Sequence, residues 1–248
     1  MPQLSDKSLK LQESPIRKLA PHARAAEARG TNVIYLNIGQ PDMATPPEMI
    51  AELHGLSLAT LAYAPSEGLP VAREAWSAFF SSWDIGFAPD EILVTAGASE
   101  AITFILSIVA GGGGEVLVFE PCYTNYLSFA AQADVAMVPI TLKVEDGYHF
   151  GSIDRLRERV TSDSKAILLC NPSNPTGTVY TEEELEAVAQ VAMENDLFVI
   201  CDEVYREFVF GGGKVRSFTE FSDLAQRIIV VDSVSKRFNA CGVRIGCM

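Results

Sequence analysis

The 248-residue chain is poor in positive charge: 19 Lys and Arg against 32 Asp and Glu give a formal net charge of −13. Nucleic-acid binding needs clustered positive charge to neutralise phosphates, so this balance argues against a nucleic-acid partner. Long apolar runs are missing too, because the best one, Ala101 to Ala110, has about half of the roughly 20 residues that span a bilayer. The amino-terminal segment shows no secretory signal. We therefore expect a cytoplasmic protein with no membrane partner.

Patterns typical of a disulfide framework or a metal site are also absent from the sequence. The five cysteines form no C-x-x-C pair, and several lie in apolar runs such as AILLC and FVIC, where a thiol behaves as a small hydrophobe. The three histidines are scattered without metal-ligand spacing (His22, His54, His149). We predict no metal site and a reducing compartment.

The composition is typical of a chain with a buried core, since 48% of the residues are hydrophobic and 21% are charged. The amino-terminal part predicts a helix over about 14–30, with Ser14 as N-cap, Pro15 in the first turn and Gly30 past the end. An extended segment over 33–42 follows, then a helix from about Pro47, a loop over 63–70 and a helix over 71–83.

From Ile92 onward, short apolar runs alternate with helical patterns. The runs cover 92–95, 115–119, 135–140, 165–170, 197–202 and 227–232, and a last one, VRIGCM, begins a further strand. Helical patterns between them include SEAITFILSIVA and TEEELEAVAQVAMEND, the second capped by Thr181. This alternation predicts an α/β fold in three α/β/α layers, with helices on both faces of a mostly parallel sheet.

Ligands of such sheets bind at the carboxyl ends of the strands. The segments that follow the apolar runs are polar and aromatic: TAGASE, EPCYTNY, NPSNPTG, DEVYRE and DSVSKRF. The sequence therefore predicts a site at this edge of the sheet.

Three matches to generic motifs are rejected, because each lacks a feature that the motif requires. The GGGG run precedes a strand and is no dinucleotide fingerprint, and GGGK lacks the rest of a P-loop. The S-x-x-K of residues 233–236 matches penicillin-binding enzymes, but neither S-D-N nor K-T-G occurs in the chain.

The segment SVSKRFNACGVRIG, residues 233–246, carries a candidate nucleophile and a candidate anion site. A desolvated Lys236 would have a lowered pKa and could attack an aldehyde. Ser233, Ser235 and Arg244 could bind a phosphate, Arg244 through its forked donors. On this segment alone, a solvent-facing turn lysine is the alternative.

Other residues at the same edge fit a flat, charged ligand. Asp202 ends an apolar strand, where a carboxylate needs a cation such as a protonated pyridine nitrogen. The free N–H groups at Ala98 and Ser99 begin a helix and favour an anion, and Tyr123 could stack on a ring. The NPSNPTG loop is rigid and fixes the amide of Asn174. The alternatives are a helix cap at Asp202, core packing at Tyr123 and a simple turn at Asn174.

The chain resembles the class I aminotransferases of the aspartate aminotransferase family (fold type I), enzymes that depend on pyridoxal 5′-phosphate (PLP). The resemblance runs from about Ser14 to Met248 through seven blocks in order: LNIGQPD, YAPSEG, TAGASEA, PCYTNY, NPSNPTG, DEVYREF and SVSKRFNACGVRIG. It implies a PLP-binding large domain over 46–248, and an arm and helix over 1–45 that form an incomplete small domain. It also implies amino acid and 2-oxo acid substrates, with aspartate-type or broad specificity, and a homodimer.

The resemblance assigns a role to each candidate residue. Lys236 corresponds to the Schiff-base lysine, which also moves the substrate proton, and Asp202 to the partner of the ring nitrogen. Tyr205 and Asn174 correspond to the donors to the ring's phenolate oxygen, with Asn174 also at the substrate. The remaining assignments are Tyr123 for ring stacking, Ala98, Ser99, Ser233, Ser235 and Arg244 for the phosphate, Tyr63 for the partner subunit's cofactor phosphate, and Gly39 for the substrate carboxylate.

Family members continue for roughly another 100–150 residues, which complete the small domain and supply an arginine for the substrate carboxylate. We therefore expect this chain alone to transaminate weakly. A PLP-dependent β-lyase or a decarboxylating enzyme of the same fold, a non-catalytic PLP-binding module, and a truncated product that binds nothing stably remain as alternatives.

Overall fold

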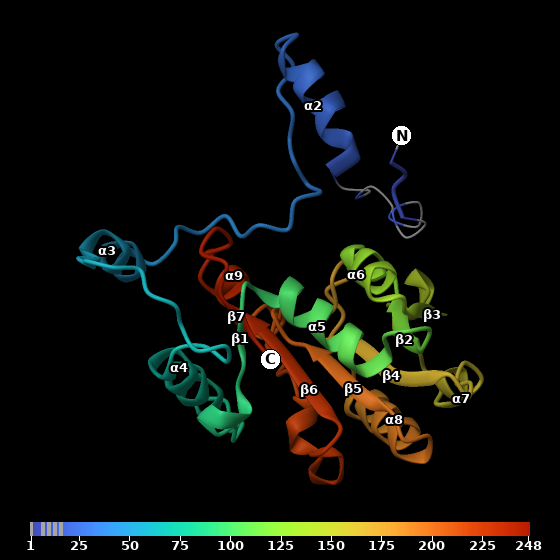
Figure 1. The fold of residues 1–248 in the computed structure, drawn as a ribbon. Coiled ribbons are helices and arrows are strands. Elements are labelled where there is room, and N and C mark those ends of the chain that lie inside the picture. Colours follow the sequence, from blue (N-terminus) through green and yellow to red (C-terminus); the bar gives the residue numbers. More distant parts are fainter. Residues whose placement is uncertain (1, 6–7, 9–10, 12–13, 15–16) are drawn as a thin grey trace.

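The computed structural model describes residues 2–5, 8, 11, 14 and 17–248 (Figure 1). A seven-stranded sheet with the order β1-β7-β6-β5-β4-β2-β3 forms its centre. The strands are β1 (Val94–Thr95), β2 (Glu115–Glu120), β3 (Ala136–Thr141), β4 (Ser164–Cys170), β5 (Phe198–Asp202), β6 (Ile228–Ser233) and β7 (Gly246–Cys247). Neighbouring strands from β3 to β6 pair in parallel, and only β7 pairs antiparallel, with β6 and β1. The predicted mostly parallel sheet is confirmed.

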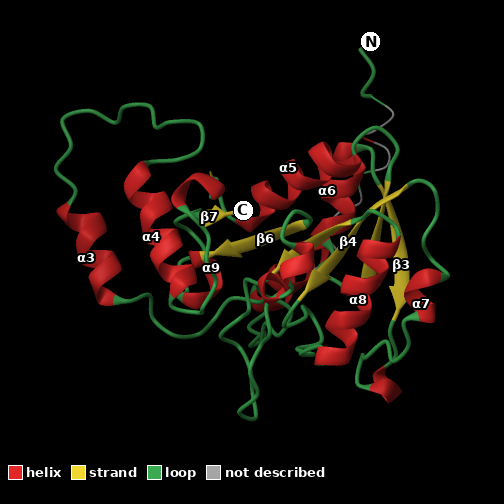
Figure 2. Ribbon diagram, turned by 90° about the horizontal axis from the view of Figure 1, so that it is seen from below, coloured by secondary structure: helices red, strands yellow, loops and turns green. Residues whose placement is uncertain are grey.

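The two faces of the sheet are covered by different helices, because successive strand residues point to opposite sides. Val116 and Ala166 pack with α5 (Ala98–Ala110) and α6 (Asn125–Ala133) in one core cluster. Leu117 and Ile167 pack with α8 (Glu182–Glu194) and α4 (Pro70–Ser81) in the other. Both views show helices on each side of the strands (Figures 1 and 2), which confirms the three α/β/α layers.

Helix α8 begins where the sequence places its cap. The Thr181 hydroxyl accepts from the Glu184 backbone N–H at 3.3 Å, and the Glu184 carboxylate accepts from the Thr181 N–H at 3.0 Å. This reciprocal capping box satisfies two helix-end donors. The shorter helices are α7 (Asp154–Arg157) and α9 (Val234–Arg237), with 3₁₀ turns at Pro89–Glu91, Val144–Asp146, Phe218–Glu220 and Ser222–Leu224.

The amino-terminal helix starts later than its sequence pattern predicts. A 3₁₀ turn (Arg17–Leu19) leads into α2 (Ala20–Glu27), whose N-cap is Leu19, so the prediction of Ser14 as N-cap is wrong. Proline is tolerated in a first helical turn, and Pro21 occupies that turn here. Pro15, predicted for this position, lies outside the described residues.

Two coil segments flank α3 (Pro47–Gly55), and Figure 1 shows α2 and α3 lying away from the sheet. Apolar side chains of the two coil segments are exposed, for example Leu36 at 92% and Leu61 at 88%. The predicted strand over 92–95 is shortened to β1, where Val94 and Thr95 pair with Cys247 and Gly246 of β7, and Leu93 and Met248 exchange two further backbone hydrogen bonds beside them. None of the helices described here is long and apolar enough to cross a membrane.

Candidate active site

The polar segments predicted at the sheet edge do meet there. Cys170, at the end of β4, is in register with Asp202, at the end of β5, and Asp202 is in register with Val231 on β6. The 171–177 loop, Asp202 and Ser233 therefore lie side by side at the carboxyl ends of three neighbouring strands.

Asp202 is a buried carboxyl group, 4% exposed, with two donors directed at it. The Tyr126 hydroxyl donates to its Oδ2 at 2.5 Å, and the Val204 backbone N–H donates to its Oδ1 at 3.3 Å. Burial raises the pKa of Asp202 to about 6, because the charged form loses its hydration, and the two donors and the Lys236 charge oppose this shift. The carboxyl group is thus held in one orientation, where a cationic ligand atom would favour its charged form.

Tyr126 is a neighbour of Asp202 that the sequence pattern did not single out. It lies on α6 in the PCYTNY block, three residues after Tyr123, and its ring meets the Tyr123 ring edge-on with centroids 5.4 Å apart. The Tyr123 hydroxyl accepts from Asn125 Nδ2 at 2.7 Å. Burial raises the pKa of both tyrosines, so both hydroxyls are neutral donors at physiological pH.

The Lys236 amine connects the sheet edge at the carboxyl ends of the strands with a coil segment that is distant in sequence. Its Nζ donates to the Gly39 backbone oxygen at 2.5 Å and lies 5.8 Å from the centroid of the Tyr205 ring. The two candidate residues Lys236 and Gly39 are therefore neighbours despite 197 positions of sequence separation.

Tyr205 and Asn174 also face one another, from the loops after β5 and β4. The Asn174 amide nitrogen lies 3.5 Å from the Tyr205 hydroxyl, at the upper limit of a hydrogen bond. Burial raises the pKa of Tyr205, which keeps its hydroxyl protonated. A ligand oxygen between these two groups would find two donors.

The predicted anion-binding residues come from two elements. The Ser233 hydroxyl caps α9 by accepting from the Ser235 N–H at 3.1 Å, and the two hydroxyl oxygens are 2.8 Å apart. The Arg244 guanidinium donates to the Cys241 oxygen at 2.9 Å and to the Ala96 oxygen at 3.0 Å, next to the first turn of α5. Ala98 and Ser99 form that turn, whose free N–H groups favour an anion.

Two glycines make this close approach possible. A Cβ on Gly97 would lie 2.3 Å from Arg244 Nη2, and the φ of +84° at this residue disfavours other residue types. A Cβ on Gly246 would lie 2.7 Å from the Ala98 nitrogen. Only glycine at both positions lets the start of α5, β7 and the arginine pack together.

Tyr63 lies outside this group. Its side chain is fully exposed in the coil between α3 and α4. Within one chain, the structure does not bring it to the other candidate residues.

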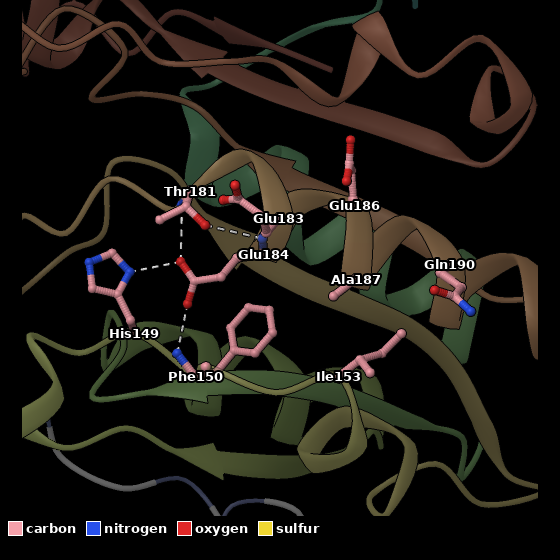
Figure 3. Close-up of a pocket in the computed structure, with 10 residues that line it drawn as sticks. His149, Phe150, Ile153, Thr181, Glu183, Glu184, Glu186, Ala187 and Gln190 are labelled. Atoms are coloured by element: carbon pink, nitrogen blue, oxygen red, sulfur yellow. Dashed lines mark hydrogen bonds and ion pairs between the residues drawn. The ribbon is translucent and has the colours of Figure 1, made fainter.

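An open groove lies elsewhere, between α8 and the segment before α7 (Figure 3). In it the Glu184 carboxylate accepts from the Phe150 N–H at 2.7 Å and lies 2.7 Å from His149 Nδ1. The Glu184 carboxylate is already committed to the capping of α8, and no candidate residue lines the groove. Across the described residues, no three His, Cys, Asp or Glu side chains are grouped as metal ligands would be.

Comparison with known families gives a match over most of the chain. Residues 31–248 match the family model described as aminotransferase class I and II. The chain belongs to this family. The family resemblance of the seven sequence blocks is confirmed.

Named relatives of this aminotransferase chain agree with the match. It is 35% identical over 240 residues to a probable aspartate/prephenate aminotransferase of Aquifex aeolicus, covering 95% of this chain and 60% of that protein. It is 32% identical over 238 residues to an aspartate aminotransferase of a Bacillus species, covering 94% of this chain and 60% of that protein.

The fold agrees as well. An aspartate aminotransferase from Thermus thermophilus, solved with maleate, superposes with a TM-score of 0.90 at 28% identity, covering all of this chain and 64% of that one. The chain thus spans about 60% of the length of the curated relatives it matches.

Proposed function

We propose that this chain is the PLP-binding part of an aminotransferase, which moves an amino group between an amino acid and a 2-oxo acid. Residues 46–248 are assigned to the large domain, and residues 1–45 to a small domain. The observation that carries the proposal is the meeting, at one sheet edge, of an amine (Lys236), a buried carboxyl group (Asp202) and an anion cup (Ser233, Ser235, Arg244 and the start of α5).

The donor set fits PLP at both ends. The raised pKa of Asp202 falls when a cation lies beside it, and a protonated ring nitrogen is such a cation. The anion cup offers hydroxyls, a guanidinium and helix N–H groups, which suit a phosphate. When bound, PLP supplies an electron-withdrawing ring that stabilises negative charge on the substrate's α-carbon.

Each residue then has a defined task. With PLP bound, Asp202 would hold a proton at the ring nitrogen, and Tyr126 fixes the Asp202 carboxylate. The Lys236 amine would hold the aldehyde carbon with loss of water, and once the substrate's amine has replaced it, the freed Lys236 amine would move a proton at the substrate's α-carbon. Tyr205 and Asn174 would donate to the ring's phenolic oxygen, and Tyr123 would stack on the ring.

The substrate and assembly proposals rest on the Gly39 segment, the named relatives and Tyr63. The Gly39 oxygen accepts from the Lys236 amine, which supports a contact between the 37–42 loop and the substrate carboxylate, and Asn174 is proposed to contact the substrate as well. Relatives named for aspartate and prephenate support an aspartate-type or broad specificity. The fully exposed Tyr63 is free to reach a second copy, which supports a homodimer. We also propose that the protein is located in the cytoplasm.

Reductive trapping tests the proposed function directly. The chain is incubated with PLP, reduced with borohydride, digested and mapped by mass spectrometry. We expect the label on Lys236, because this amine adjoins Asp202 and the anion cup. A label on Lys165 or Lys214 in its place, or no label at all, contradicts the proposal.

A second assay separates the aminotransferase from a β-lyase of the same fold. The PLP-loaded chain is given single amino acids, and the products are measured. Pyridoxamine phosphate with a 2-oxo acid indicates transamination, whereas pyruvate with ammonia indicates β-elimination.

The Gly97→Ala variant should lose both PLP affinity and stability. The new Cβ displaces the Arg244 guanidinium, which removes a charge-assisted contact of about 1.5–3 kcal/mol, or at least ~10-fold in affinity. The positive φ adds strain of about 1–3 kcal/mol.

Gly112→Ala is the matched control, because Gly112 has a φ of +85° with open space around it. Titration with PLP and thermal unfolding measure the two effects. Equal affinities of the two variants would contradict this role of Gly97.

A further inference from the structure

Arg237, the residue after Lys236, is a buried cation to which the proposed site assigns no task. Its side chain is 7% exposed. Its Nη2 donates to Asp232 Oδ2 at 2.9 Å, and its Nε donates to Glu207 Oε1 at 2.5 Å. Its Cζ lies 3.8 Å from the centroid of the Phe79 ring on α4. We call this set of four residues the Arg237 clamp.

The clamp matters because α9, which carries Lys236, cannot hold itself in place. It has four residues, and a helix of one turn gains too few hydrogen bonds to offset the ordering of its backbone. Its position therefore depends on tertiary contacts. Arg237 provides them to three other segments: β6, the loop after β5, and α4.

The partners of Arg237 lie next to other residues of the site. Asp232 is fully buried, and its second oxygen accepts from the Ser233 N–H at 2.6 Å, so it also holds the anion cup. Glu207 follows Tyr205 by two residues. One guanidinium therefore links the segments that carry the cup, the phenol and the reactive amine.

A buried guanidinium with two carboxylate partners is better suited to orienting α9 than to stabilising the fold. Burying ions costs hydration free energy, and apolar residues of similar size often stabilise a core as well. A guanidinium adds what apolar packing lacks, namely a planar fork with fixed directions and a face that stacks on an aromatic ring. We propose that Arg237 is a positioning residue that fixes α9, so that the Lys236 amine meets the PLP aldehyde in reactive geometry. The inference rests on the proposed function.

Two variants remove parts of the clamp. Arg237→Lys keeps the charge and loses the fork, and Glu207→Gln changes the more exposed of the two carboxylate partners, at 27% against 0% for Asp232. Should Arg237→Lys not fold, Glu207→Gln decides alone.

Arg216→Lys is the matched control. Arg216 also contacts two carboxylates, of Glu182 and Glu220, and its Cζ lies 4.6 Å from the Phe221 ring centroid, away from α9. The Arg216→Lys variant therefore measures the general effect of replacing an arginine that contacts two carboxylates and an aromatic ring.

Two readouts are taken below the unfolding temperature. The first is the rate of PLP trapping on Lys236, and the second is hydrogen exchange of the backbone amides of residues 234–240. We expect both clamp variants to slow trapping by about 10–100-fold, because small displacements of a reactive group have effects of this size. Exchange should quicken by about 10-fold, whereas Arg216→Lys should leave both unchanged.

A folded clamp variant that traps PLP at the wild-type rate overturns the inference, whatever its melting temperature. Equal slowing in Arg216→Lys overturns it as well. If wild-type Lys236 is not labelled, the proposed function fails, and hydrogen exchange then decides whether the clamp fixes α9: unchanged exchange in both clamp variants overturns this.

Discussion

The Lys236→Ala variant is expected to lose covalent capture of PLP completely. No other lysine in the described part of the chain adjoins both Asp202 and the anion cup, so no amine replaces it. Proton transfer at the substrate would fall as well, since positioned acid–base groups contribute about 10²–10⁴-fold to rates. Absorbance of the PLP-loaded chain and mass spectrometry after reduction measure the loss.

The fold should tolerate this change. Lys236 is half-buried and its amine donates a hydrogen bond to the Gly39 oxygen, so we expect a stability loss of about 1 kcal/mol. Lys165→Ala, on β4, is the control and should capture PLP as the wild type does. Residual labelling of the Lys236→Ala chain at wild-type yield would show that another amine is the reactive one.

The Asp202→Asn variant should bind PLP about 10–150-fold more weakly, because a buried hydrogen bond to a charged group contributes about 1.5–3 kcal/mol. An amide cannot hold the ring nitrogen protonated. Glu203→Gln is the control for binding: Glu203 is equally buried but contacts Ser217 and Arg206, so its folded variant should keep PLP affinity.

The same variant should gain stability relative to the wild type as pH rises. Folding raises the pKa of Asp202 from 3.8 to about 6, so between these values the folded chain binds a proton that the unfolded chain has lost. The free energy of unfolding of the wild type therefore falls with rising pH in this window, by about 1.4 kcal/mol per unit at most.

Asparagine does not ionise, so the stability difference should shift by up to about 3 kcal/mol in favour of Asp202→Asn between pH 4 and pH 7. Urea unfolding at a series of pH values measures it. A difference that does not change with pH would mean that Asp202 is not held in a desolvated environment.

Local pattern was enough to predict most of the sheet and the place of the site. Strands such as β4 and β5 are continuous apolar runs buried on both faces, so their hydropathy alone marks them. Because the strands are parallel, the polar segments after them had to meet at one edge. Thr181 and Glu184 form a capping box that is complete within four residues, and it too was predictable.

Contacts between distant segments could not be predicted in this way. Helix α2 begins at Ala20 and not near Ser14. Pro15 and Pro21 both suit the first turn of a helix, and the local sequence does not decide between them. The length of β1 depends on β7, which is some 150 residues away in sequence. The role of Tyr126 could not be read from the sequence, because only the packing of α6 on the sheet brings its hydroxyl to Asp202.

The sequence by itself determined the α/β class, the family and the identity of the candidate residues, because these depend on periodicity and on short motifs whose spacing is local. Tertiary structure decided the environment of each residue. Burial raised the pKa of Asp202, glycine at position 97 admitted the Arg244 guanidinium, and the ion pairs of Arg237 fixed the short helix that carries Lys236. The physical reason is that desolvation and close packing depend on which segments come together in space, and no local pattern encodes this.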